Sequence, residues 1–344
     1  MKSLRSTAPG KLVLCGEYAV LDGAPAISAA VDRRASVTLR EADGDILVRT
    51  LGFRDGEYRF RMEASGLKPV RKQDELPLVR AAIGNAGLAV GAGLDVELDT
   101  SAFFADDTKL GLGSSAALTA ALVPALAEWQ GQDPHKSRLR TQAVHSHLQG
   151  GHGSGVDIRT SLEGGLIRFS REVGHDDGCI GTITYSFRTV AWPAGLEAAV
   201  LFSGIAASTP QKLARLDAQS RDPVSDELVD DARSAADAWQ SGDARSVLAA
   251  TAAFTRTLER FSDAYALDVF GGGHASLTEL AESQGLVYKP CGAGGGDVGI
   301  VLGDNTEGIA QFVERATASG FTELDVRLGG KTEVEGLSVE WTHD

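Results

Sequence analysis

A glycine-rich loop leads directly into a long apolar helix near the middle of the chain. The loop is GLGSSAAL, residues 111–118, and the Ala- and Leu-rich run behind it continues to Gln-Gly-Gln-Asp-Pro. Glycine lets backbone N–H groups turn towards a ligand, and a helix N-terminus adds unpaired N–H groups and a positive dipole end. The combination predicts an anion site, most often one for phosphate.

The residues around this loop suit a phosphate chain but do not require one. Lys109 adds a cation two residues upstream, and the hydroxyls of Ser114 and Ser115 could either cap the helix or bind Mg²⁺. Taken alone, a tight turn before a capping serine pair is the simpler interpretation. The Walker pattern G-x-x-x-x-G-K-[ST] is absent, and no glycine stands at the third position of a dinucleotide fingerprint.

Three further glycine-rich segments accompany this loop: APGKLVLCGEYAVLDGAPAI at residues 8–27, GHGSGVDIRTSLEGG at 151–165 and KPCGAGGGDVGIVL at 289–302. Glycine in such numbers costs conformational entropy on folding, so it indicates close approach of the backbone to a strand or a ligand. In this order the segments resemble the GHMP kinase superfamily, the small-molecule kinases named for galactose, homoserine, mevalonate and phosphomevalonate.

The order of expected elements is typical of an α+β protein with two domains. The chain has 344 residues, and strands, helices, strands, helices and strands follow one another, ending with a strand at residues 322–328. The resemblance implies an N-terminal domain like the second domain of ribosomal protein S5 and a ferredoxin-like C-terminal domain. We place the boundary at residue 192, with an ATP-binding domain at residues 1–191 and a second GHMP domain at 192–344.

Composition favours a small-molecule substrate over a macromolecular one. The net charge is −14, which disfavours binding to nucleic acid or to an anionic membrane. No apolar segment approaches the roughly 20 residues that span a bilayer. Cys15, Cys179 and Cys291 are odd in number and far apart, so we expect a reduced, cytoplasmic compartment.

Lys11 and Asp157 are the predicted catalytic pair. Lys11 follows Pro9-Gly10 at the start of a strand, where it could neutralise the transferred phosphoryl group. Asp157 could orient Lys11 or act as a general base. We favour the orienting role, because the second pKa of a phosphate acceptor is about 6 and such an acceptor hardly needs a strong base. If each residue is considered without the other motifs, the alternative interpretations are that Lys11 is an exposed lysine on an edge strand and that Asp157 is a helix N-cap.

The resemblance also implies ligands for both substrates. It implies that ATP and Mg²⁺ are the cofactors, with Ser115 as a metal ligand and Ser114 as the alternative. The residues implied to bind ATP are Lys109, Gly111, Leu112, Gly113, Ser114, Ser115 and Ala116. Those implied to bind the acceptor are Tyr18, Ser154, Ser208, Gly292, Ala293 and Gly294.

Details of the motifs are most similar to the phosphomevalonate kinase group. They are Tyr18 in the first motif, Lys109 before the loop, GIAASTP at residues 204–210 and Asp297 after the last glycines. The group's reaction converts (R)-5-phosphomevalonate and ATP to 5-diphosphomevalonate and ADP. The alternatives are a mevalonate kinase or a kinase for another small alcohol, then a mevalonate diphosphate decarboxylase, then a regulatory protein without catalysis.

Several positions leave questions open. Residues 143–150 hold no carboxylate where mevalonate kinases carry a second Mg²⁺ ligand, and Cys291 replaces the usual Ser or Thr. Glu17 is expected to support the turn at Asp22-Gly23, and Asp297 could cap its own glycine loop. The spacing of His145, His147 and His152 disfavours a zinc site and favours loop or helix-surface positions. The acceptor carboxylate could be held by Arg71, Lys72, Arg159, Lys212 or Lys289.

Overall fold

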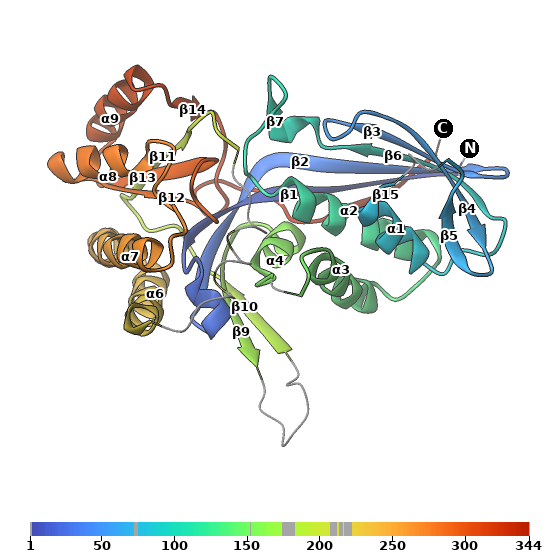
Figure 1. Ribbon diagram of the computed structural model, residues 1–344, viewed down its shortest axis with the longest axis horizontal. Coiled ribbons are helices and arrows are strands. Elements are labelled where there is room, and N and C mark those ends of the chain that lie inside the picture. Colours follow the sequence, from blue (N-terminus) through green and yellow to red (C-terminus); the bar gives the residue numbers. More distant parts are fainter. Residues whose placement is uncertain are drawn as a thin grey trace.

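The computed structural model describes residues 2–71, 75–151, 153–173, 183–206, 212, 216 and 222–343. Within these ranges it shows an α+β architecture with two main sheets, each covered by its own helices (Figure 1). This confirms the predicted fold class. No helix in the described part of the chain is both long and apolar enough to cross a membrane. The expected cytoplasmic location stays a prediction.

The larger sheet is built on two long neighbouring strands, β1 (Lys2–Cys15) and β2 (Ala26–Ala42), which pair antiparallel. From β2 the sheet continues in both directions, in the order β10-β9-β2-β6-β3-β4-β5. The remaining strands are β3 (Ile46–Leu51), β4 (Gly56–Glu63), β5 (Gly66–Pro69), β6 (Gly93–Asp99), β9 (Leu166–Val173) and β10 (Ile183–Thr189). A small hairpin of β7 (Phe104–Ala105) and β8 (Thr108–Lys109) lies beside the short helix η2 (Ser101–Phe103).

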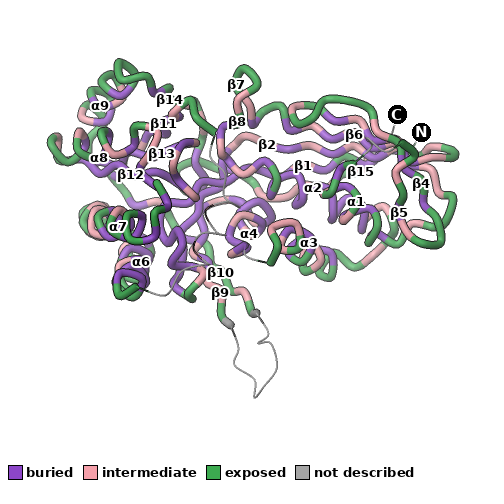
Figure 2. Tube along the Cα trace, viewed as in Figure 1, coloured by how far each residue is buried: buried purple, intermediate pink, exposed green. Residues whose placement is uncertain are grey.

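Helix α2 (Ser114–Trp129) is the centre of the first layer of helices. It packs on β1 and β2 and is surrounded by α1 (Pro77–Gly84), α3 (Pro134–Leu148) and α4 (Val156–Glu163). Most of α2 is buried, which explains its largely apolar composition, and the helix contains Pro124. Figure 2 shows the same buried zone running through β1, β2 and α2. The loop at residues 111–113 is therefore anchored to the most deeply packed helix.

The second sheet has four antiparallel strands in the order β12-β13-β11-β14. Its strands are β11 (Glu197–Phe202), β12 (Val287–Pro290), β13 (Val298–Gly303) and β14 (Thr322–Leu324). Helices α8 (His274–Ser283) and α9 (Thr306–Ala318) pack against it, while α6 (Pro223–Ser241) and α7 (Ala244–Ala264) form a pair beside it. The pair also contacts the short helix η1 (Ala19–Asp22) and β2, so the two halves share a core.

The end of the chain returns to the first sheet. Strand β15 (Ser338–His343) pairs antiparallel with β1, with Lys2 opposite His343. The strand predicted at residues 322–328 is shorter than expected, because β14 ends at Leu324 and Leu328 makes only an isolated bridge to Val31. The domain boundary at residue 192 stays a prediction, and β15 lies on the far side of it in sequence.

Candidate active site

Lys11 lies beneath the glycine-rich loop that precedes α2. Its backbone N–H donates to the Leu112 carbonyl at 2.9 Å. A Cβ added to Gly113 would lie 2.9 Å from Lys11 Cγ, so the lysine stem runs directly under that glycine. The residue is only 8% exposed, so the alternative of an exposed edge-strand lysine is wrong. Burial of the stem holds the ammonium group at the end of a rigid strand.

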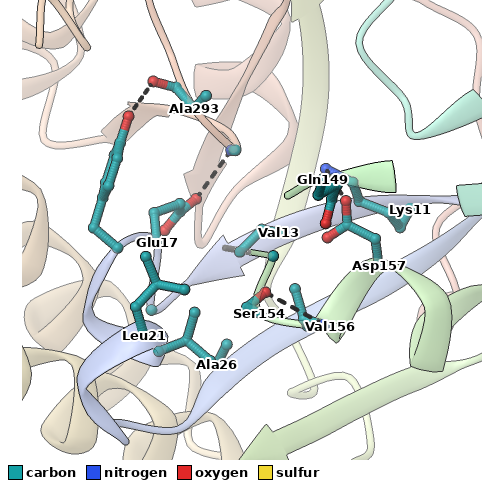
Figure 3. A pocket seen from close by; sticks show the side chains of 15 residues that line it. Lys11, Val13, Glu17, Leu21, Ala26, Gln149, Ser154, Val156, Asp157 and Ala293 are labelled. Carbon is teal, nitrogen blue, oxygen red and sulfur yellow. Dashed lines mark hydrogen bonds and ion pairs between the residues drawn. The ribbon is translucent and has the colours of Figure 1, made fainter. Parts of the chain in front are cut away.

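Asp157 faces Lys11 from the start of α4. Lys11 Nζ and Asp157 Oδ2 are 3.9 Å apart, and the aspartate side chain is 28% exposed (Figure 3). Gly155, with φ 89°, is the N-cap of this helix, so Asp157 is not the cap. Its carboxylate is therefore available both to the lysine and to the pocket.

Gln149 was not predicted as a site residue, yet its side chain lies beside Lys11 and Asp157 (Figure 3). Gln149 is the residue directly after α3. Its Oε1 lies so close to Gly153 that a Cβ added to this glycine would overlap it. Ser154 lines the same pocket, and its Oγ accepts a 3.4 Å hydrogen bond from Val156 N–H. Only the glycines that follow Gln149 in sequence hinted at its position, since a side chain approaches closely only where its neighbours have none.

The glycine loop at residues 292–296 covers the same pocket from the second half of the molecule. A Cβ on Gly292 would lie 3.6 Å from Lys11 Nζ. Tyr18, which adopts a positive φ of 61°, donates from its hydroxyl to the Ala293 carbonyl at 2.8 Å. A Cβ on Gly294 would lie 2.4 Å from the Val269 carbonyl oxygen. The glycines are thus required for close backbone contact, as the sequence predicted.

A buried ion pair supports this loop. Lys289 Nζ donates to Glu17 Oε1, and Glu17 Oε1 also accepts from Gly292 N–H at 3.4 Å. The predicted role of Glu17 at the turn after η1 is therefore wrong, because its carboxylate reaches across to β12. Burial opposes the charge of Lys289, but Cys291 and Glu17 together raise its pKa above the usual value.

Cys291 faces the buried ion pair. Its sulfur lies 3.9 Å from Lys289 Nζ and the residue is 4% exposed. Burial raises the pKa of the thiol to about 11, so it stays protonated at neutral pH. A thiol here fills space beside Lys289, which accounts for Cys at this position without a contact to substrate.

The start of α2 forms the other side of the site. Gly113 is the N-cap with φ 84°, and no side chain caps the helix, so the serine-cap interpretation is wrong. Ser114 is buried and Ser115 is exposed, so Ser115 is the hydroxyl that a ligand can reach. Asp297 lies against Gly111, where an added Cβ would be 2.3 Å from its Cγ. The two glycine loops therefore touch each other.

A larger apolar cavity opens beside Ser114 and Ser115. Its volume is about 540 Å³, and Lys109 lies on its lining. Two of its side chains, Leu51 and Phe53, are 47% and 53% exposed and offer apolar surface at its mouth. The other apolar lining includes Leu76, Val79, Leu98 and Leu118. Such a cavity suits a flat aromatic ring.

The candidate cations for an acceptor carboxylate differ in where they lie. Arg71 donates to the Glu57 carbonyl, Arg159 pairs with Glu163, and Lys289 is fully buried. Lys212 instead lies on the glycine loop, donating to the Gly294 and Asp268 carbonyls at 2.9 Å each. Lys72 and the predicted acceptor ligand Ser208 lie outside the described residues, as does His152.

No group of three or more His, Cys, Asp or Glu residues forms a metal cage in the described ranges. His145 was expected to lie in a loop or on a helix surface, but it is buried, with an exposed fraction of 2%. Burial lowers the pKa of His145, while the nearby charge of Asp157 acts to raise it. Mg²⁺ in nucleotide enzymes is usually held by substrate phosphates with one or two protein oxygens. The exposed hydroxyl of Ser115 and the carboxylate of Asp157 fit that pattern.

Comparison with known proteins shows which family has sequences similar to this chain. Residues 78–165 match the family model "GHMP kinases N terminal domain". A phosphomevalonate kinase from a Streptomyces species is 34% identical over 335 residues, covering 86% of this chain and 89% of that protein. A mevalonate kinase from Methanothermobacter thermautotrophicus is 33% identical over 208 residues, covering 57% of this chain and 62% of that protein.

The fold agrees with these matches. The structure of Streptococcus pneumoniae phosphomevalonate kinase in complex with phosphomevalonate and AMPPNP superimposes with a TM-score of 0.75. Its identity is 18%, and the match covers 94% of this chain and 99% of that one. The family match, the Streptomyces relative that matches most of the chain and the shared fold together show that the chain belongs to the GHMP kinases and is a phosphotransferase.

Proposed function

We propose that the protein transfers the γ-phosphoryl group of ATP to (R)-5-phosphomevalonate, giving 5-diphosphomevalonate and ADP. The observation that carries this proposal is the position of Lys11, under Gly113 of one glycine loop, near Gly292 of another and 3.9 Å from Asp157. The choice of acceptor is supported by the Streptomyces phosphomevalonate kinase, which matches most of the chain.

We propose that ATP binds at the start of α2. The residues proposed to bind it are Lys109, Gly111, Leu112, Gly113, Ser114, Ser115 and Ala116. Backbone N–H groups of the loop and the positive end of α2 would hold the phosphates. The adenine ring would enter the cavity of about 540 Å³ beside Ser115, where Leu51 and Phe53 offer apolar surface. Lys109, on the rim, would pair with the phosphate chain.

Mg²⁺ would be held by Ser115 and Asp157 together with the phosphates. It would neutralise charge on the transferred phosphoryl group. The protein oxygens available for it are few, which is usual for Mg²⁺ because it keeps several waters.

Lys11 and Asp157 would assist the phosphoryl transfer itself. An oxygen of the acceptor phosphate attacks the γ-phosphorus, and the bond between that phosphorus and the bridging oxygen of ADP breaks. Two anions repel at contact distance, so the buried ammonium of Lys11 would neutralise both. Asp157 would hold Lys11 in place and need not remove a proton, because the acceptor is already largely ionised at neutral pH.

The acceptor would lie in the pocket under the glycine loop at residues 292–296, hereafter the second glycine loop. Tyr18, Ser154, Gly292, Ala293 and Gly294 line it or border it. The Tyr18 hydroxyl is already engaged by the Ala293 carbonyl, so its proposed role is to shape the loop as well as to touch the acceptor. Lys212 is the proposed partner of the acceptor carboxylate, since its ammonium lies on the glycine loop.

The first experiment is a coupled assay of ADP release with ATP and Mg²⁺. Mevalonate, 5-phosphomevalonate and 5-diphosphomevalonate are supplied in separate reactions. We expect turnover with 5-phosphomevalonate only. Turnover with mevalonate alone would instead favour the mevalonate kinase alternative, which the Methanothermobacter relative supports. It would leave the roles of Lys11 and Asp157 standing.

A further inference from the structure

A buried histidine lies behind the second glycine loop and belongs to none of the groups described above. His274 is the first residue of α8 and follows three glycines, of which Gly272 and Gly273 have φ of 66° and 89°. Its side chain is fully buried between Tyr288 and Phe321, with ring centroids 5.9 and 5.5 Å away. A polar ring is buried here only if both nitrogens are satisfied.

Both ring nitrogens have partners, and the partners fix the tautomer. His274 Nε2 lies 3.0 Å from the Gly296 carbonyl oxygen, and Nδ1 lies 2.8 Å from the Tyr288 hydroxyl. A carbonyl can only accept, so Nε2 carries the hydrogen and Nδ1 accepts from Tyr288. Burial lowers the pKa of His274 to about 4, so the ring is neutral at pH 7.

The histidine therefore holds one end of a single peptide group. The carbonyl of Gly296 accepts from His274, and the N–H of the same peptide, on Asp297, donates to the Ile205 carbonyl at 2.5 Å. A peptide held at both ends cannot rotate. Gly296 and Asp297 have φ of 137° and 54°, both in the left-handed half of the map, so this stretch would otherwise relax easily.

The direction of this peptide decides where Asp297 lies. The Asp297 side chain packs against Gly111 in the loop at residues 111–113. It lies within 2.6 Å of the position that a Cβ on Gly111 would take. We propose that His274 is a positioning residue, which fixes the Gly296–Asp297 peptide and so sets the second glycine loop against the loop at residues 111–113. Its effect on catalysis rests on the proposed function, but its effect on the loop does not.

Two variants separate the two hydrogen bonds of the ring. In His274→Gln the amide nitrogen takes the place of Nε2 and can still donate to Gly296. In His274→Asn the side-chain amide takes the place of Nδ1 and keeps only the Tyr288 partner. We expect His274→Asn to lower kcat/KM by about 10- to 100-fold, mainly through KM for the acceptor, and His274→Gln to stay within about threefold of wild type.

Tyr288→Phe is the control for a merely structural role. It removes the Nδ1 partner and leaves the Gly296 bond in place, so we expect reduced thermal stability with kinetics near wild type. Equal activity of His274→Asn and His274→Gln would overturn the proposal. So would an equal loss of activity in Tyr288→Phe and His274→Asn.

A readout without substrate keeps the inference separate from the proposed function. Hydrogen exchange, measured on a fragment spanning residues 291–298, should be faster in His274→Asn than in wild type and unchanged in His274→Gln. Unchanged exchange in His274→Asn would refute the positioning role, whatever the enzyme phosphorylates. If hydrogen exchange is faster in His274→Asn but the wild-type enzyme does not phosphorylate 5-phosphomevalonate, only the proposed acceptor is refuted.

The wild-type protein provides a test that needs no variant to fold. With ¹⁵N-labelled histidine, NMR should show His274 neutral at pH 7 with its hydrogen on Nε2. A hydrogen on Nδ1, or a charged ring, would contradict the bond to Gly296.

Discussion

At the scale of single residues, Lys11 combines a buried stem with a charge at the meeting point of two loops. Replacing it with Met keeps the stem under Gly113 and removes only the charge. We expect Lys11→Met to fold normally and to lose about 10²- to 10³-fold in kcat, as when one preorganised donor to a transition state is removed. Steady-state kinetics with 5-phosphomevalonate and ATP check this.

Lys109→Met is the matched control, because Lys109 is exposed at the rim of the apolar cavity. It should raise KM for ATP more than it lowers kcat. A Lys11→Met enzyme that turned over within a few-fold of wild type would remove Lys11 from the mechanism.

His274 also predicts a pH dependence of stability. Its pKa is about 4 in the folded protein against an ordinary value of 6.5, since burial disfavours the charged ring. The unfolded state therefore binds more protons between these values, and stability is lost as pH falls from about 6.5 towards 4. The loss from this group is on the order of 2–3 kcal/mol.

The measurement is urea unfolding of wild type and His274→Gln at pH 7 and pH 5. Comparing the two cancels the titration of the carboxylates. The variant should lose less free energy of unfolding between these pH values than wild type does. Identical losses would mean that the ring does not titrate below its ordinary range.

Sequence identified some of the residues in the site and missed others for physical reasons. The places of Lys11, Asp157, Tyr18 and Gly292 follow from local motifs. The role of Glu17 was predicted wrongly and His274 was missed, because their partners lie at Lys289 and Gly296, far away in the chain. A hydrogen bond between distant segments leaves no local pattern. Sequence favoured Ser115 over Ser114 only through the resemblance, and it is packing that shows Ser115 to be the exposed one.

At the scale of elements, the N-terminus of α2 depends on a glycine that no other residue can replace without strain. Gly113 has φ 84°, and an added Cβ would lie 2.9 Å from Lys11 Cγ. Gly113→Ala should therefore displace both the loop and the lysine. We expect a loss of about 1–3 kcal/mol in the free energy of unfolding and a fall in kcat of roughly 10-fold or more.

Gly131 offers a control just past the other end of the same helix. It also has a positive φ, 63°, but a Cβ there would meet nothing within 4 Å. Gly131→Ala should cost about 1 kcal/mol in stability and leave kcat unchanged. Thermal melting and the ADP-release assay together distinguish the two positions. Equal kinetic effects would mean that Gly113 matters only for folding.

The helices and most strands could be predicted because their periodicity and end signals are local. The last strand could not, because β15 is defined by pairing with β1, more than three hundred residues earlier. The same holds for β14, because the apolar alternation at residues 322–328 continues past Leu324, where the chain makes only an isolated bridge to β2 between Leu328 and Val31. Strands depend on distant partners, whereas helices satisfy their own backbone.

At the scale of the whole molecule, the two sheets are joined by a buried ion pair as well as by packing. Glu17 follows β1, and Lys289 belongs to β12 of the second sheet. Their side chains are 2% and 0% exposed. Because Glu17 Oε1 also accepts from Gly292 N–H, the pair couples the joint between the sheets to the loop over the pocket.

Removing one partner should be worse than removing both. Glu17→Gln or Lys289→Met alone leaves a buried charge without its counterpart, for which we expect a loss of about 3–5 kcal/mol in the free energy of unfolding. The double variant should recover much of that loss, because neither charge then remains. Urea unfolding of the four proteins gives the coupling energy as a double-mutant cycle. Losses that simply add would show that the two side chains act independently. The glycine loop at residues 292–296 would then be held in position by the hydrogen bonds from Tyr18, Lys212 and His274 instead.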